Sequence, residues 1–314
     1  MNNNFNCTNW ENIYTYSYNQ EVTSLAVFPD PDIFAARYNN NIVVQKISEK
    51  EPIQTLTGTV NFFGGFSTPI VVDPTGEFIA TGMIEGWDEN VIKLYNLKTN
   101  TCKTLGIHGY GNLTRVTAVA FSPNSKTVIS AGGKTIKLWD TEYEIIERGE
   151  LSGRFSNVKC LAVDPNDGLL AIASNQGAIN IYKIASKKEI LIKPPSRFPI
   201  NSLAFSPDGQ FLVSGNNQGK ILIWNLRTGR EYPFSWKQNQ SINSVAFSPN
   251  GYFLATAYDD KTIKIWNLKN QNYSEHCIIM EEHDEAVTAV AFTPDGKKLI
   301  SGSKDGTVRV WRPV

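Results

Sequence analysis

The stretch Val-Ala-Phe-Thr-Pro-Asp at 290–295 recurs along the chain, and its copies decide how the remaining sequence is read. Close copies are Val-Ala-Phe-Ser-Pro-Asn at 119–124 and 245–250, and Leu-Ala-Phe-Ser-Pro-Asp at 203–208. With the weaker copies included, the proline of the motif recurs every 42 to 49 residues at Pro29, Pro74, Pro123, Pro165, Pro207, Pro249 and Pro294. A period of this size indicates an array of one repeated supersecondary unit.

The last copy shows what one unit contains. Residues 287–293 are apolar and suited to a strand, and Pro294-Asp295-Gly296 is a turn signal. A second short strand is expected at 297–303, followed by the hairpin signal Asp305-Gly306 and a third strand at 307–311. No segment has a sustained period of 3.6 residues, so we expect almost no helix.

The third strand ends in an aromatic residue in six of the seven copies, and the first copy has Gln45 there. The aromatic residues are Tyr95, Trp139, Tyr182, Trp224, Trp266 and Trp311. A more variable fourth strand follows, for example at 146–151 and 275–281. Four-stranded sheets this small cannot bury both faces alone, whereas radial packing around an axis lets each sheet cover its neighbours.

The phrases Leu138-Trp139-Asp140, Ile223-Trp224-Asn225, Ile265-Trp266-Asn267 and Val310-Trp311 complete the pattern. With them the chain resembles the WD-repeat family over roughly residues 12 to 314. The resemblance implies an all-β, seven-bladed β-propeller with four-stranded antiparallel blades. We expect a tail at 1–11 and a single propeller domain at 12–314, with blades that begin near residues 22, 70, 116, 158, 200, 242 and 287.

The last blade lacks a fourth strand downstream, because the chain ends three residues after Trp311. Residues 12–17 precede Val22 by the same offset at which the fourth strand of the sixth copy precedes Val287. We therefore expect residues 12–17 to form the outer strand of the last blade. Closing the ring in this way removes exposed strand edges that would otherwise pair with other chains.

The resemblance also implies a hydrogen-bonded set of His, Ser or Thr, Asp and Trp within a blade. Only the last copy has all four, as His283, Ser301, Asp305 and Trp311. The third copy keeps a His, a Ser and the Trp, but its turn is one residue short and has no Asp. These residue types would also suit a hydrolase triad. Their place inside a blade, where buried polar groups must be paired, favours a structural role.

Composition excludes several classes of function. Lys plus Arg and Asp plus Glu number 30 each, so no bulk charge attracts nucleic acid or an anionic membrane. The sequence has neither an apolar run of 18 residues nor a secretory leader, which predicts a cytoplasmic protein. Four scattered cysteines and three histidines predict no metal site, and no cofactor is expected. Phosphate-loop, zinc-protease and nucleophile-elbow motifs are missing, so the chain is not expected to be an enzyme.

Binding is expected on the face that we call the top face. It carries the loops that lead into the inner strands and the turns between second and third strands. A lengthened turn at 83–90 carries Trp87, and the interblade loop at 106–115 carries Tyr110 and Arg115. Aromatic residues and arginine are enriched at binding hot spots. The predicted partner-binding residues are Phe62, Phe63, Phe66, Trp87, Tyr110, Arg115, Arg154, Phe155, Arg197 and Phe198.

The resemblance implies a non-catalytic interaction scaffold or adaptor, monomeric on its own, that binds a peptide or partner domain. An alternative is a nucleic-acid-binding subunit. Arg154-Phe155 and Arg197-Phe198 place aromatic rings beside cations, a combination that binds single-stranded DNA or RNA. A further alternative is an enzyme built on the propeller, which would need titratable groups that converge on the central channel. For Phe62, Phe63 and Phe66, packing beneath their own loop is the alternative to binding.

Overall fold

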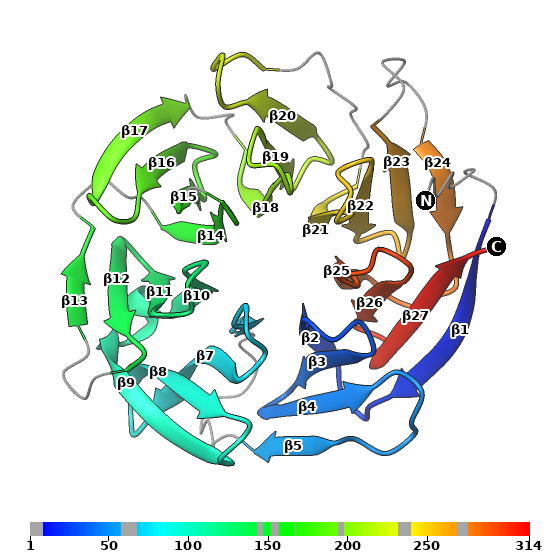
Figure 1. Cartoon of the computed structure of the whole chain (residues 1–314), viewed down its shortest axis with the longest axis horizontal. Helices are drawn as coiled ribbons and strands as arrows, with labels where there is room; N and C mark the ends of the chain where they lie inside the picture. Colours follow the sequence, from blue (N-terminus) through cyan, green and yellow to red (C-terminus); the bar gives the residue numbers. More distant parts are fainter. Residues whose placement is uncertain are drawn as a thin grey trace.

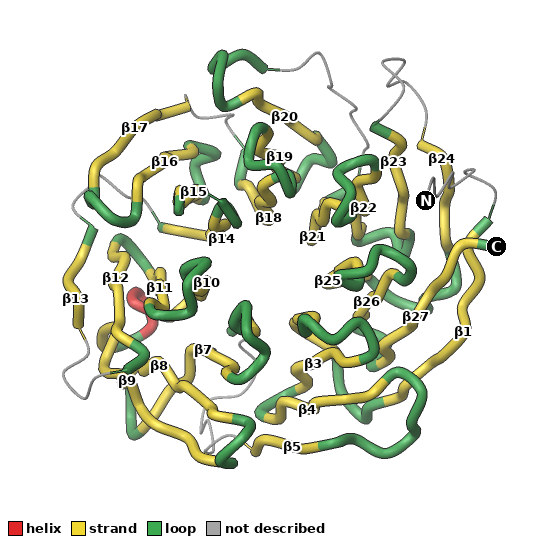
Figure 2. Tube along the Cα trace, viewed as in Figure 1, coloured by secondary structure: helices red, strands yellow, loops and turns green. Residues whose placement is uncertain are grey.

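The computed structural model describes residues 9–57, 68–142, 147–151, 157–166, 168–193, 198–231, 240–268 and 276–314. Their strands form seven antiparallel sheets that stand as blades around a central axis (Figure 1). In the described ranges, the helical content is one 3-10 helix, η1 (Asn112–Thr114), and turns and loops account for the rest (Figure 2). The predicted all-β, seven-bladed propeller is confirmed.

Each blade is a meander that runs from an inner strand to an outer strand. The inner strands are β2 (Val22–Val27), β6 (Ile70–Val72), β10 (Val116–Phe121), β14 (Val158–Val163), β18 (Ile200–Phe205), β21 (Ile242–Phe247) and β25 (Val287–Phe292). The second strands are β3 (Ile33–Tyr38), β7 (Phe78–Glu85), β11 (Thr127–Gly132), β15 (Leu169–Ser174), β19 (Phe211–Asn216), β22 (Phe253–Tyr258) and β26 (Leu299–Ser303).

The third and outer strands complete the blades. The third strands are β4 (Asn41–Lys46), β8 (Glu89–Asn96), β12 (Thr135–Asp140), β16 (Ile179–Lys183), β20 (Ile221–Asn225), β23 (Ile263–Asn267) and β27 (Thr307–Pro313). The outer strands are β5 (Gln54–Thr57), β9 (Thr101–Tyr110), β13 (Glu147–Glu150), β17 (Lys188–Lys193), β24 (His276–Met280) and β1 (Trp10–Ser17). In blade 5 the described sheet has three strands, and Glu231 bridges Trp224 at its outer edge.

The core lies between the blades, where the inward faces of adjacent sheets meet. Between blades 2 and 3, for example, Ile92 and Val116 share an apolar cluster with Trp139. A Cβ atom on Gly106 of β9 would lie 2.5 Å from the ring of Trp139, so glycine there lets the outer strand pass over the indole. Full burial of each large apolar side chain stabilises the folded state by about 1.5–3 kcal/mol.

Hydrogen bonds across neighbouring blades join the inner strands into a ring. In six blades the register shifts after the first residue of the inner strand, as a β-bulge does. In four of these six blades, the side chain of the second residue of the inner strand donates a hydrogen bond to a backbone carbonyl of the next blade. The bonds are Thr117 Oγ1 to Val158 O at 2.7 Å, Asn201 Nδ2 to Ile242 O at 2.9 Å, Asn243 Nδ2 to Val287 O at 3.0 Å and Thr288 Oγ1 to Val22 O at 2.6 Å.

The two ends of the described chain meet in blade 7. Strand β1 pairs antiparallel with β27, from Trp10 opposite Pro313 to Ser17 opposite Thr307, and Figure 1 shows the two strands side by side. The predicted closure by the N-terminal strand is therefore confirmed, and the strand begins two residues before the predicted 12–17. The Trp10 ring also packs edge-on against Phe292, with the ring centroids 6.2 Å apart.

Candidate binding surface on the top face

The hairpin of β7 and β8 in blade 2 supports the candidate surface. Its strands pair without a break from Phe78 opposite Asn96 to Glu85 opposite Glu89. The turn is therefore short and centres on Trp87, and the lengthened turn predicted at 83–90 was wrong. The glycine and the acidic residues in this segment suggested a loop. Met83 and Val91 are instead buried and lie within the two strands.

The neighbouring outer strand β9 is also longer than predicted. Residues 106–110, expected within an interblade loop, pair with β8 up to Tyr110 opposite Glu89. The loop proper is 111–115 and contains η1. Backbone N–H of Gly111 donates to Asp88 O at 2.8 Å, and buried Asn90 Nδ2 donates to Gly111 O at 2.9 Å. These bonds tie the loop to the hairpin tip.

Three exposed apolar side chains stand on this frame: Trp87, Tyr110 and Leu113, which we call the hairpin-tip patch. Their exposed fractions are 88%, 59% and 87%. The loop that carries Leu113 also abuts the turn of blade 3, where a Cβ atom on Gly133 would lie 2.2 Å from Leu113 O. Gly133 has φ of 57°, which glycine adopts without strain. The patch is thus braced by two blades.

Two carboxylates lie beside Trp87 at the hairpin tip. Asp88 is exposed next to Trp87, and Glu89 is partly exposed. Glu85 forms an ion pair with Lys93 of the same hairpin. Arg115 is partly buried at the end of the loop, immediately before β10. The surface therefore offers apolar area beside carboxylates, which suits a partner that carries both apolar and basic groups.

Of the other seven predicted binding residues, the structure describes only Phe198. Phe62, Phe63, Phe66, Arg154, Phe155 and Arg197 lie outside the described residues. Phe198 is exposed in blade 5, just before β18, and belongs to a different sector of the ring. Leu113 was not predicted, because a single leucine in a loop carries no signal unless its exposure is known.

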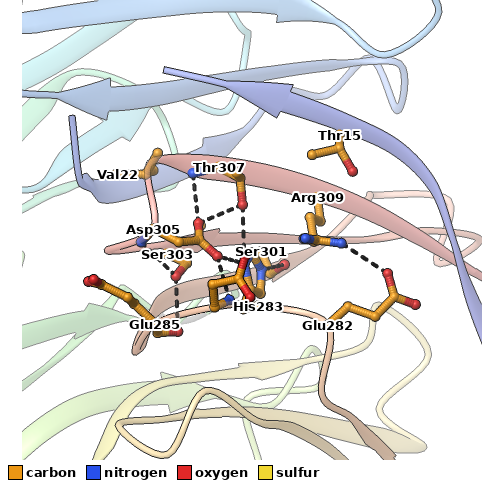
Figure 3. Close-up of polar contacts among 12 residues, drawn as sticks. Thr15, Val22, Glu282, His283, Glu285, Ser301, Ser303, Asp305, Thr307 and Arg309 are labelled. Carbon is orange, nitrogen blue, oxygen red and sulfur yellow. Dashed lines mark hydrogen bonds and ion pairs between the residues drawn. The ribbon is translucent and has the colours of Figure 1, made fainter. Parts of the chain in front are cut away.

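The polar set predicted in the last copy is a buried chain of hydrogen bonds (Figure 3). His283 contacts Asp305 Oδ2 through Nδ1 and Ser301 Oγ through Nε2, both at 2.8 Å. Trp311 Nε1 donates to the same Ser301 Oγ at 2.8 Å. If His283 is neutral with its proton on Nδ1, Nδ1 donates to Asp305 and Nε2 accepts from the Ser301 hydroxyl, so both hydrogen bonds form.

Burial and hydrogen bonding act in opposite directions on this set. Burial alone would raise the pKa of Asp305, but bonds donated by Thr307, His283 and the backbone lower that pKa to about 2. Burial lowers the pKa of His283, against the opposing effect of Asp305. Ser301 is fully buried and holds the indole of Trp311, so no substrate reaches its hydroxyl. The geometry therefore supports a structural role over a hydrolase triad.

Other blades keep parts of the set. In blade 3, His108 Nδ1 contacts Ser130 Oγ at 2.8 Å, and Trp139 Nε1 donates to that oxygen at 2.7 Å. Thr135 Oγ1 lies 3.1 Å from His108 Nε2 and corresponds to Thr307 of blade 7, which lies 3.2 Å from His283 Nδ1. In blade 6, Trp266 Nε1 donates to Thr256 Oγ1 at 2.8 Å.

Comparison with known protein families agrees with the ring geometry. The family described as "WDR19 first beta-propeller" matches residues 117–278, and the one described as "WD domain, G-beta repeat" matches residues 274–312. The chain belongs to the WD-repeat β-propeller family. No curated protein matches the sequence.

No helix among the described residues has the length and apolar character needed to cross a membrane. Within the same residues, no three His, Cys, Asp or Glu side chains gather in a group that could hold a metal ion.

Proposed function

We propose that this propeller is a non-catalytic interaction scaffold that binds a peptide or partner domain on its top face through the hairpin-tip patch. The observation that carries the proposal is the near-complete exposure of Trp87 and Leu113, at 88% and 87%, on a hydrogen-bonded frame. WD-repeat propellers typically mediate protein interactions, and that family property supports the assignment.

The physics of the patch favours a protein partner. Full burial of Trp87 and Leu113 would stabilise a complex by about 1.5–3 kcal/mol for each side chain. Because the tip is already fixed by the bonds of Asn90 and Gly111, little ordering entropy is lost on binding. Asp88 and Glu89 at the rim would select partners with basic residues and speed their approach.

The scaffold, as proposed, is monomeric on its own and works in the cytoplasm. Strand β1 pairs with β27, so blade 7 gains its fourth strand from the same chain and needs no strand from a second copy. Cys102 is exposed and Cys160 partly buried, and both are free thiols, which is the usual state in a reducing compartment.

Affinity capture from the native lysate tests the proposal. The bait would be compared with a Trp87→Ala, Leu113→Ala variant. The matched control is Ile53→Ala, which removes another exposed apolar side chain from the rim of blade 1. Thermal melting would establish that all three baits fold alike. A partner lost from the patch variant and retained by the control supports the proposal, whereas equal capture by all three contradicts it.

A further inference from the structure

An open pocket lies between blades 5 and 6 on the bottom face, which carries the Pro-containing turns between inner and second strands. The pocket encloses about 440 Å³, within the range of about 300–1,000 Å³ typical of ligand sites. Its walls are mainly apolar and aromatic, formed by Pro207, Phe211, Ile223, Phe247, Pro249, Tyr252 and Leu268. The ring of Tyr252 is exposed at the rim.

The neighbouring junction, between blades 6 and 7, shows what kind of side chain such a pocket accepts. By repeat position, Phe211, Ile223 and Phe247 correspond to Phe253, Ile265 and Phe292, which line the junction of blades 6 and 7. There the chain supplies its own aromatic occupant, because Trp10 packs against Phe292 and joins the same apolar cluster. A tryptophan thus covers one junction, while no residue that the structure describes occupies the equivalent pocket between blades 5 and 6.

Two other junctions differ at the deciding positions. Between blades 3 and 4, Thr127 stands where Phe211 lies, and Lys187 lines the pocket. Between blades 7 and 1, Lys298 stands at that position and forms an ion pair with Asp32 at 2.5 Å. The aromatic walls between blades 5 and 6 are therefore a property of these residues, not of every junction in a propeller.

The pocket also carries a negative charge, the carboxylate of Asp208. Asp208 Oδ1 accepts bonds from Ser206 Oγ at 2.5 Å and from the Gln210 N–H at 3.0 Å. The carboxylate is exposed, and it forms no ion pair with any residue that the structure describes. Among the described residues that line the pocket there is no Lys or Arg. A cation carried by a ligand would complement this charge.

We propose that the pocket between blades 5 and 6 is a second docking site, which takes an aromatic side chain of a partner peptide with an adjacent Arg or Lys. The aromatic ring fills the cavity as Trp10 does at the next junction, and the cation contacts Asp208. The site lies on the face opposite the hairpin-tip patch, so the binding role of the pocket and that of the patch are tested independently.

The test uses the full chain and a synthetic probe, the fluorescein-labelled peptide Gly-Ser-Arg-Trp-Ser-Gly, followed by fluorescence anisotropy. Matched peptides replace Trp by Ala or Arg by Glu. We expect weak binding, with a dissociation constant of about 100 µM, because a short peptide loses much ordering entropy. The Trp to Ala peptide should bind at least about tenfold more weakly, since it lacks the buried anchor.

Variants of the protein locate the site. Tyr252→Ala should weaken binding about fivefold, and Asp208→Asn about threefold, as loss of one exposed ion pair does. Asp208→Lys should reverse the preference and favour the peptide with Glu. The control is Asp295→Asn, at the equivalent turn of blade 7. Absence of binding at about 1 mM peptide, or binding that none of the pocket variants changes, would overturn the proposal.

Discussion

A buried histidine makes the stability of the propeller depend on pH in a way that one substitution can isolate. His108 is 3% exposed, and its burial lowers its pKa from 6.5 to about 4. Between these values the unfolded chain binds a proton that the folded chain does not. Stability from this group is therefore fully present above pH 6.5 and is lost as the pH falls through about 4.

The size of the effect follows from the pKa difference. One pH unit corresponds to about 1.4 kcal/mol of unfolding free energy, so the shift is worth at most about 3 kcal/mol. Urea unfolding between pH 7 and 4.5 would be compared for the wild type and His108→Gln. The pH dependence that all other titratable groups contribute cancels when the unfolding free energies of the two proteins are subtracted. The variant should be less stable at pH 7 and should lose less stability on acidification.

His283 provides the comparison, because the same ring type sits in a different electrostatic setting. Asp305 at 2.8 Å opposes the effect of burial on the pKa of His283, whereas His108 faces Thr135 instead. His283→Gln should therefore change the acid slope less than His108→Gln does. If wild type and His108→Gln lose the same unfolding free energy over this pH range, the reasoning about buried neutral histidine is refuted.

Two further predictions concern the ring and its buried polar set. Deletion of residues 1–17 exposes the edge of β27 and removes the half-buried side chains of Trp10, Ile13 and Tyr16. The unfolding free energy measured by urea titration should therefore drop by about 3 kcal/mol, and an unchanged midpoint would disprove closure. Ser301→Ala leaves the indole of Trp311 without its acceptor and should cost about 2 kcal/mol. Ser214→Ala should be nearly neutral, since Ser214 Oγ has no partner in the described structure; equal losses in both would contradict this.

The fold could be predicted because its signals are local and repeated. The proline of the turn that follows Phe292 and the aromatic residue that ends the third strand, Trp311 in the last copy, recur at nearly constant spacing. Closure could be predicted for the same reason, since the period leaves one strand position to be filled. The hydrogen-bonded set at His283 also follows from repeat position, because equivalent residues of a repeat occupy equivalent places.

The binding surfaces could be predicted only in part, because they depend on which residues different strands place together. Residues 83–90 look like a loop, but Met83 and Val91 are buried within paired strands, so the hairpin is longer and Trp87 lies at its tip. The aromatic pocket needs Phe211 and Phe247 on facing blades, 36 residues apart in the sequence. Nothing in either segment alone indicates that Trp10 packs against the junction of blades 6 and 7.

Photo-crosslinking from position 87 tests the proposed scaffold role most directly. A benzophenone amino acid would replace Trp87, and the control would carry it in place of Ile53 on the rim of blade 1. Irradiation in native lysate should yield a discrete protein adduct from position 87, which the Leu113→Ala background weakens and the control does not form. Adducts of equal yield from both positions, or none from position 87, would contradict a binding surface at the hairpin tip.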